Sequence, residues 1–303
     1  MEAVLTIDKL SKAYNGKQAV GAISLTVQRG ELFGLIGPDG AGKTTLFKIL
    51  VTLLTPDQGQ ATVLGLDVVR DFRALRTQIG YMPGRFSLYP DLTVEENVSF
   101  FATVFGTSIQ ANYELIQDIY GQLEPFRQRR AGALSGGMKQ KLALCCALIH
   151  KPNVLFLDEP TTGVDAVSRR EFWDMLARLK DHGLTILVST PYMDEASRCD
   201  RIALMDGGQL LAVDTPKGIE QRFDQPLYAV RARDTYRLIQ DLRQAPFTQT
   251  CYAFGEYLHL TTQPGTYPAA IETYLHERQH KAIEVNPITA SIEDSFMALM
   301  NNG

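Results

Sequence analysis

The sequence has no apolar run long enough to cross a lipid bilayer. A membrane-spanning helix needs about 20 consecutive apolar residues, and the longest candidate, Leu142 to Ile149, is less than half of that. Residues 1–3 lead directly into a strand-like run, without the basic segment and apolar core that are typical of a signal peptide. We therefore expect a soluble, cytosolic chain whose association with a membrane depends on a partner.

The sequence also lacks an excess of positive charge and closely spaced cysteines. Its 34 acidic and 30 basic residues give a net charge of −4, whereas nucleic acids and anionic lipids favour a basic surface. We therefore expect no nucleic-acid partner. The four cysteines show no C-x-x-C spacing, and residues of this kind in a reducing compartment are usually small buried side chains rather than metal ligands.

The first 222 residues alternate between strand-like and helical patterns. Residues 31–37 form a nearly continuous apolar run before a glycine-rich turn, and helical spacing follows in residues 43–54. Two more apolar runs, residues 154–157 and 184–188, flank a helical stretch. Strands that are apolar throughout are typical of a mostly parallel sheet covered by helices on both faces. The pattern predicts an α/β fold.

Two further regions have patterns of their own. Residues 92–149 are mainly helical, and Thr93 with Glu96 predicts a capping box at the start of one helix. We expect a helical subdomain at about residues 84–147. Beyond residue 222, strand-like and helical stretches alternate with no recognisable chemical motif. We expect residues 223–303 to form a small accessory α+β domain.

The glycine-rich turn has the spacing of a phosphate-binding loop. Residues 37–44 read G-P-D-G-A-G-K-T, which fits G-x-x-x-x-G-K-[ST] between a buried strand and a helix. Glycines allow successive backbone N–H groups to point at phosphate oxygens, and the helix N-terminus adds its positive end. Lys43 would reach the terminal phosphates and the Thr44 hydroxyl would bind Mg²⁺. Asp39 is expected to turn outward.

A second acidic motif follows a later apolar strand. Residues 154–159 read V-L-F-L-D-E. We expect Asp158 to contribute to the Mg²⁺ shell and Glu159 to act on the attacking water as the catalytic base. A hydrophobic strand that ends in Asp-Glu is common, but in a sequence that also has a phosphate loop it indicates a nucleoside triphosphatase.

Between these motifs, residues 134–140 read L-S-G-G-M-K-Q. This order of motifs resembles the ABC transporter ATPases, whose signature is L-S-G-G-x-x-[QR], over residues 1–222. The resemblance implies a P-loop NTPase fold with a RecA-like, mostly parallel sheet, an antiparallel β subdomain and an inserted helical subdomain. It also implies a head-to-tail dimer in which each ATP lies between the phosphate loop of one unit and the signature of the other.

The resemblance assigns ATP and Mg²⁺ as cofactors and gives each site residue a role. Tyr14 resembles the aromatic residue that stacks on adenine. The residues expected to bind the nucleotide are Tyr14, Gly37, Pro38, Asp39, Gly40, Ala41, Gly42, Lys43, Thr44 and Thr45, with Ser135, Gly136 and Gly137 acting on the ATP of the partner unit.

Two residues depart from the family pattern. The family places glutamine after the Met-Pro of residues 82–83 and histidine after the Ser-Thr of residues 189–190, where this sequence has Gly84 and Pro191. Glycine cannot coordinate a cation or a water, and proline has neither a ring nitrogen nor a backbone N–H. We expect MgATP to bind and hydrolysis to be slow, as in the degenerate half of an asymmetric pair.

The segment S-I-E-D-S-F-M-A-L at residues 291–299 resembles the closing segment of exporter ATPases. We expect coupling to export through a separate membrane-spanning permease, with the chain at the inner face of the cell membrane. The second ATPase unit could be a different chain, a fused unit or an identical copy. An ordinary hydrolysing homodimer, a non-transport ABC ATPase and a regulatory ATP-binding module stay open as alternatives.

Overall fold

The computed structural model describes residues 2–301 and divides into two compact units, residues 1–216 and 217–303. Each is described by itself. Among the described residues, no helix has the length and apolar character needed to cross a membrane. The four cysteines are buried and unpaired, as expected from their spacing.

The centre of the first unit is a six-stranded sheet, and it is mostly parallel because helices or long segments connect its strands. Its order is β10 (Gln209–Asp214), β9 (Arg201–Asp206), β3 (Leu32–Ile36), β8 (Thr185–Thr190), β7 (Val154–Asp158) and β6 (Ile79–Met82). Only β10 is antiparallel to its neighbour. Strands β3, β7 and β8 are buried along their whole length, as the apolar runs predict.

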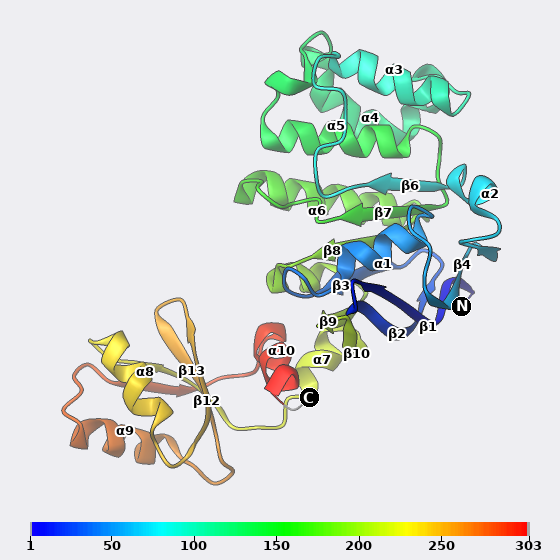
Figure 1. Cartoon of the computed structure of the whole chain (residues 1–303). Coiled ribbons are helices and arrows are strands. Elements are labelled where there is room, and N and C mark those ends of the chain that lie inside the picture. Colours follow the sequence, from blue (N-terminus) through cyan, green and yellow to red (C-terminus); the bar gives the residue numbers. More distant parts are fainter. Residues whose placement is uncertain (1, 302–303) are drawn as a thin grey trace. The chain divides into compact units, whose positions relative to one another are not determined.

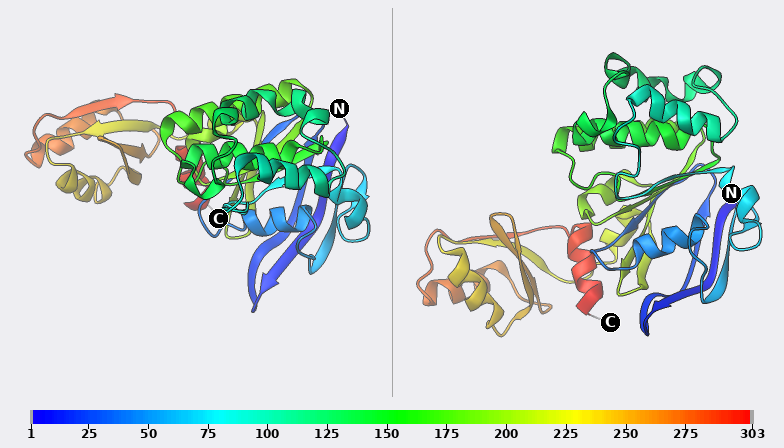
Figure 2. Two further views of the ribbon diagram at one scale, coloured as in Figure 1. Left: turned by 90° about the horizontal axis from the view of Figure 1, so that it is seen from above. Right: turned by 45° about the horizontal axis from the view of Figure 1, so that its top comes forward.

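One face of this sheet packs against α1 (Lys43–Leu50) and a second, antiparallel sheet. The second sheet has the order β2 (Lys17–Gln28), β1 (Ala3–Tyr14), β4 (Gln58–Val63) and β5 (Leu66–Asp67). Figures 1 and 2 show α1 beside these blue strands. Helix α6 (Ala166–Asp181) contacts β8, and the short α2 (Phe72–Arg76) precedes β6.

Three helices follow β6 and precede β7: α3 (Val94–Val104), α4 (Tyr113–Leu123) and α5 (Gly136–Leu148). Figure 1 shows them grouped at one end of the unit. The predicted capping box is present at α3, because Thr93 Oγ1 accepts from the Glu96 N–H and Glu96 Oε2 accepts from the Thr93 N–H. The helical region expected from residues 92–149 is therefore confirmed as a set of helices.

The second unit has a β-α-β-β-α-β order. Its elements are β11 (Leu227–Arg231), α8 (Thr235–Arg243), β12 (Thr248–Phe254), β13 (Tyr257–Thr262), α9 (Pro268–Glu277) and β14 (Glu284–Pro287). The antiparallel sheet has the order β12-β13-β11-β14, a ferredoxin-like arrangement. Helix α7 (Pro216–Gln221) precedes these elements and α10 (Ile292–Asn301) follows them. Asp294 of α10 accepts a 2.7 Å hydrogen bond from His259 Nδ1 of β13.

Candidate nucleotide-binding site

The loop at residues 37–42 joins the end of β3 to the start of α1. Gly40 and Gly42 have φ angles of +83° and +103°, which residues with a Cβ rarely adopt. A Cβ on Gly42 would also lie 2.1 Å from the carbonyl oxygen of Ala19 in β2. The glycine spacing therefore allows the loop to fold back on β2 and to present its N–H groups together with the N-terminus of α1.

The side chain of Lys43 is held inside this loop. Its Nζ donates to the carbonyl oxygens of Gly37 at 2.8 Å and Pro38 at 3.0 Å, and only 3% of the side chain is exposed. Glu159 Oε1 lies 3.3 Å from the same Nζ. The lysine of the phosphate loop and the expected catalytic carboxylate, which are far apart in sequence, therefore meet at one point.

Asp158 ends β7 and accepts two side-chain hydrogen bonds on one oxygen. Thr44 Oγ1 donates to Asp158 Oδ1 at 3.1 Å, and Ser189 Oγ donates to the same atom at 2.6 Å. Two oxygens in neighbouring positions of an octahedral Mg²⁺ shell, each about 2.1 Å from the metal, lie about 3.0 Å apart. The spacing of the Thr44 and Asp158 oxygens is therefore compatible with two neighbouring positions in a Mg²⁺ shell.

Ser189 was not expected at the site. Strands β7 and β8 pair so that Asp158 lies opposite Ser189, and Ser189 is fully buried. The available sequence signal was a serine near the end of an otherwise apolar strand. Tyr81 of β6 is also close: burial, and then the negative charge of Asp158, raise the pKa of its hydroxyl.

Glu159 has an unusual backbone conformation for a residue with a long side chain. Its φ is +50°, which is costly outside glycine and is usually held by surrounding contacts. The Glu159 N–H donates to both the carbonyl oxygen and the Oγ of Ser189, each at 3.0 Å. With 22% of its side chain exposed, the carboxylate lies where water can reach it.

Gly84 and Pro191 both border this cluster. A Cβ on Gly84 would lie 3.0 Å from the Asp158 carbonyl oxygen and 3.7 Å from the Glu159 Cβ. Pro191 follows Thr190, whose carbonyl oxygen accepts a 3.3 Å hydrogen bond from the first glycine of the loop, Gly37. Neither position offers a hydrogen-bonding side chain.

The nearest histidines in the sequence lie elsewhere in the fold. His150 bonds the Ile79 carbonyl oxygen at the start of β6, and His182 directly follows α6. The Tyr192 ring lies under the guanidinium of Arg169, 4.7 Å from the ring centre. These three side chains, as the structure describes them, do not supply the hydrogen-bond donor that the family's histidine would provide at the position of Pro191.

The signature segment lies at the start of α5. Ser135 caps the helix by accepting from the Met138 N–H at 3.3 Å. A Cβ on Gly137 would lie 2.7 Å from Ser168 Oγ, and one on Gly136 would lie 3.6 Å from the Gly163 carbonyl oxygen. The signature therefore packs on the segment that follows β7 in its own chain, while Ser135 and Gly136 are exposed.

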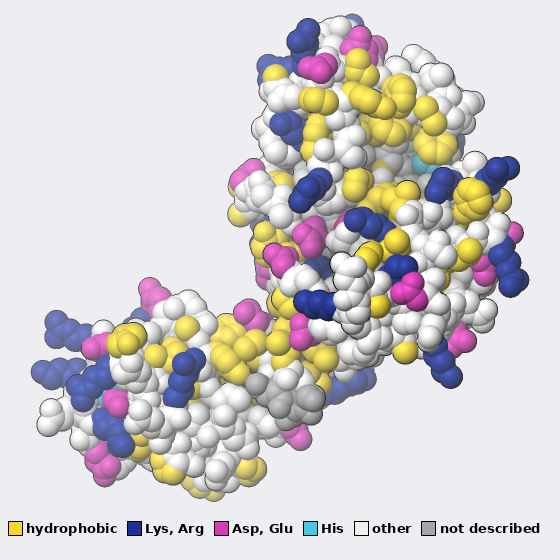
Figure 3. Space-filling model, viewed as in Figure 1, with side chains coloured by type: hydrophobic (Ala, Val, Ile, Leu, Met, Phe, Trp, Pro, Cys, Tyr) yellow, Lys and Arg dark blue, Asp and Glu magenta, His cyan; other side chains and the backbone are white. Residues whose placement is uncertain are grey.

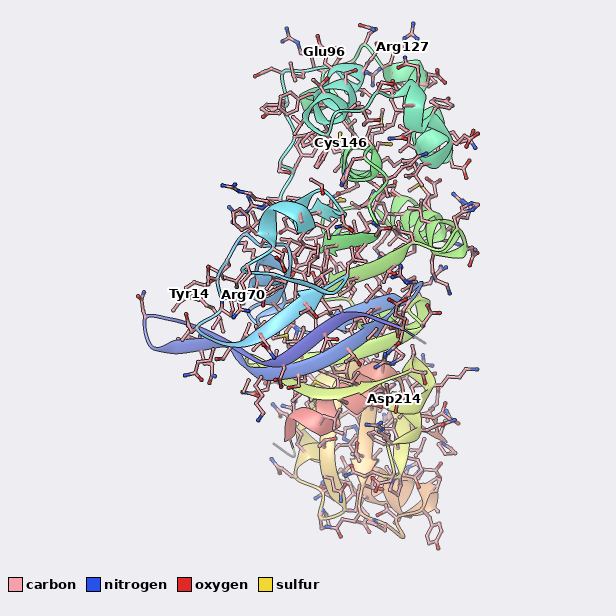
Figure 4. All side chains as sticks on the ribbon, turned by 90° about the vertical axis from the view of Figure 1, so that its right-hand side faces the viewer. Tyr14, Arg70, Glu96, Arg127, Cys146 and Asp214 are labelled. Atoms are coloured by element: carbon pink, nitrogen blue, oxygen red, sulfur yellow. The ribbon has the colours of Figure 1, made fainter. Side chains whose placement is uncertain are left out.

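The remaining expected residues surround the loop. Asp39 and Gly40 are exposed, Pro38 and Thr45 are half-buried, and Ala41 is buried with its carbonyl oxygen bonded to the Gly208 N–H. Tyr14 ends β1 with 46% of its surface exposed. Figure 4 shows Tyr14 near the free end of the β1–β2 ribbon.

Comparison with known proteins relates this arrangement to one family. A family model described as "ABC transporter" matches residues 20–162. The chain is 39% identical to the probable multidrug ABC transporter ATP-binding protein YbhF of Escherichia coli K12, over 99% of this chain and 52% of that protein. It is 36% identical to the Nod factor export ATP-binding protein I of Burkholderia pseudomallei 1710b, over 98% of this chain and 97% of that protein.

A solved structure described as the ATP-binding subunit of an ABC transporter matches with a TM-score of 0.66 and 29% identity. The match covers 73% of this chain and 93% of that one. The chain spans about half the length of YbhF and nearly the whole length of the Nod factor protein.

Proposed function

Because the chain belongs to the family of ABC transporter ATP-binding proteins, we propose that it couples ATP binding and slow hydrolysis to export through a separate membrane subunit. Its fold is the P-loop NTPase fold of that family. We further propose that its own phosphate site is the degenerate half of an asymmetric pair. The observation that carries this second proposal is the position of Gly84 and Pro191 beside Asp158, Glu159 and Gly37.

The proposed roles follow the family motifs, and the contacts within the site are compatible with them. Residues 37–45 bind the phosphates, with Lys43 at the terminal ones, and Tyr14 stacks on adenine. Thr44 and Asp158 would hold Mg²⁺, which offsets negative charge on the phosphates when it is bound. Glu159 accepts a proton from the attacking water. The Ser135–Gly137 segment lies at a helix N-terminus, with Ser135 and Gly136 exposed, and would bind the terminal phosphate of an ATP held by the partner unit.

Binding and hydrolysis are separable in this site. The loop, Lys43, Thr44 and Asp158 are all in hydrogen-bonding contact, so the groups needed for affinity are present. Loss of one positioned donor at a charge-developing oxygen commonly costs about 10²–10³ in rate. Because Glu159 is retained, we expect residual turnover rather than none.

A groove in the first unit supports a membrane partner. Its volume is about 460 Å³, and it lies between β6 with the segment that follows it and helices α3 and α5. Its lining includes Leu53, Met82, Phe101, Val104 and Phe105, and Figure 3 shows hydrophobic side chains gathered over the helices at this end. We propose that a segment of a permease occupies it, which would place the chain at the cytoplasmic face of the membrane.

The domain organisation is proposed in the same way. We assign ATP binding to residues 1–222, with the helical subdomain at about residues 84–147, and an accessory role to residues 223–303. The similarity to YbhF over half of its length is compatible with a partner ATPase unit that is fused, separate or identical.

The test compares MgATP binding and turnover of the wild-type chain, alone and with its co-purified membrane partner, with the Gly84→Gln/Pro191→His variant. We expect the wild type to bind MgATP with an affinity similar to that of the variant but to turn over about 10²–10³ times more slowly. Gly84→Ala is the matched control, because it introduces the close contact with the Asp158 carbonyl without a functional group.

Three outcomes separate the alternatives. Equal turnover of the wild type and the double variant would exclude the degenerate site and favour an ordinary hydrolysing homodimer. Failure of both to bind MgATP would reject the nucleotide site itself. Purification of the chain from membranes and cytosol with no membrane protein bound to it would favour a non-transport ATPase or a regulatory module.

A further inference from the structure

The residue proposed to stack on adenine lies at the end of a two-stranded ribbon. Tyr14 of β1 pairs with Lys17 of β2, and only Asn15 and Gly16 separate them. Their φ angles of +49° and +80° match a two-residue type I′ turn. Along β2, Lys17 is two residues from Ala19, whose carbonyl oxygen lies against Gly42. At about 3.3 Å per residue, Tyr14 is within the length of a nucleotide from the phosphate loop.

The end of this ribbon has little support from the rest of the sheet. The last pair between β1 and β4 is Ser11 with Gln58, and the register is already shifted between Asp8 and Ser11. Residues 12–14 pair only with β2, with further irregularities at Lys12 and Ala13. Because an isolated two-stranded hairpin is marginally stable in water, backbone pairing alone would hold Tyr14 loosely.

Asp57, which directly precedes β4, supplies the missing attachment. Its Oδ1 accepts from Lys12 Nζ at 2.6 Å, and its Oδ2 accepts from the Ala13 N–H at 2.8 Å. Its own N–H donates to the Ser11 carbonyl oxygen at 2.9 Å. One residue therefore binds the three positions that precede Tyr14. The Lys12 and Ala13 hydrogen bonds also lower the pKa of Asp57, because both favour the ionised carboxylate.

We propose that Asp57 is a positioning residue for the base of the bound nucleotide. It does not touch the nucleotide. It fixes the end of β1, so that the Tyr14 ring is held at a constant distance from the phosphate loop. The inference rests on the proposed nucleotide site and adds to it a residue outside the family motifs. It assigns to Asp57 a contribution to the affinity for the base and none to the affinity for the phosphates.

The test measures equilibrium binding of two probes to the full chain: MgATP, and inorganic triphosphate with Mg²⁺, which has no base. Base–aromatic stacking increases affinity by about 10- to 100-fold. We expect Asp57→Ala to weaken ATP binding about five- to tenfold and to change triphosphate binding less than about twofold. Asp57→Asn, which retains one oxygen for the Ala13 N–H, should lie between wild type and Asp57→Ala.

A double-mutant cycle separates positioning from general destabilisation. In the Tyr14→Ala background, Asp57→Ala should have no further effect on ATP binding, because the ring that it positions is gone. The matched control is Asp174→Ala, which also removes a half-exposed carboxylate from an ion pair: Asp174 is 47% exposed and lies 3.0 Å from Arg198, against 45% and 2.6 Å for Asp57. This control should change neither affinity.

Each contrary result has a distinct meaning. Equal weakening of both probes, or additive effects in the cycle, would reject positioning in favour of a general structural role. Wild-type affinity for ATP in Asp57→Ala, with Tyr14→Ala still defective, would reject this inference alone. If Tyr14→Ala binds ATP as the wild type does, the stacking role and this inference both fail. If the wild type binds neither probe, the proposed nucleotide site fails.

Discussion

Replacement of Ser189 by alanine tests whether the acidic end of β7 is held as the structure indicates. Ser189 is fully buried, and its Oγ donates to Asp158 at 2.6 Å and accepts from the Glu159 N–H at 3.0 Å. The variant removes a hydrogen bond to a charged, buried group, which is worth about 1.5–3 kcal/mol. The Glu159 N–H keeps the Ser189 carbonyl oxygen as its acceptor. We expect a loss of about 2 kcal/mol in the free energy of unfolding.

For a domain of about 200 residues, this loss corresponds to a melting temperature lower by about 4–8 °C, measurable by calorimetry on the full chain. We also expect a weaker Mg²⁺ dependence of ATP binding, because Asp158 loses one of its two side-chain donors. The control is Ser197→Ala, which removes an exposed hydroxyl bonded to the Asp194 carbonyl oxygen. Equal melting of the two variants would refute the reasoning. A lower melting temperature with unchanged Mg²⁺ dependence would restrict Ser189 to stabilising the fold.

Two further predictions concern the core and the pH. Phe156→Ala should cost about 3–5 kcal/mol in urea unfolding, because Phe156 is fully buried and meets Phe47 edge to face at 5.7 Å; an equal effect from the exposed Phe100→Ala would contradict this. Burial lowers the pKa of His150 below the value of about 6.5 in the unfolded chain, so the folded state disfavours its protonation. Stability should therefore decrease as the pH falls from about 6.5 through the folded pKa, and His150→Gln should unfold with a weaker dependence between pH 8 and pH 5.5.

The features predicted from the sequence are those that short segments determine. The glycine spacing of residues 37–44 and the apolar runs of β3, β7 and β8 each act within a few residues. The same holds for the Thr93 capping box, which involves residues three positions apart. For these, local sequence and final structure agree because the backbone conformation has few alternatives.

Other features depend on which strands lie side by side, and the sequence did not indicate them. Strand β12 (Thr248–Phe254) mixes polar and apolar residues without a clear buried side and is stabilised by pairing with β13. The contact of Ser189 with Asp158 requires the register of β7 and β8. The attachment of Lys12 and Ala13 to Asp57 requires the β1–β4 pairing. The register between strands that are distant in the chain cannot be inferred from a single sequence.

Because Glu159 Oε1 lies 3.3 Å from Lys43 Nζ, the Glu159 carboxylate and a bound phosphate would compete for the same ammonium group. A phosphate group that approaches the ammonium brings negative oxygens to the place that the Glu159 carboxylate now holds, and two anions repel each other at that distance. Arrival of the phosphates would then displace the Glu159 carboxylate from Lys43. If Glu159 is the base proposed above, its carboxylate is released by the same event that brings in the phosphates.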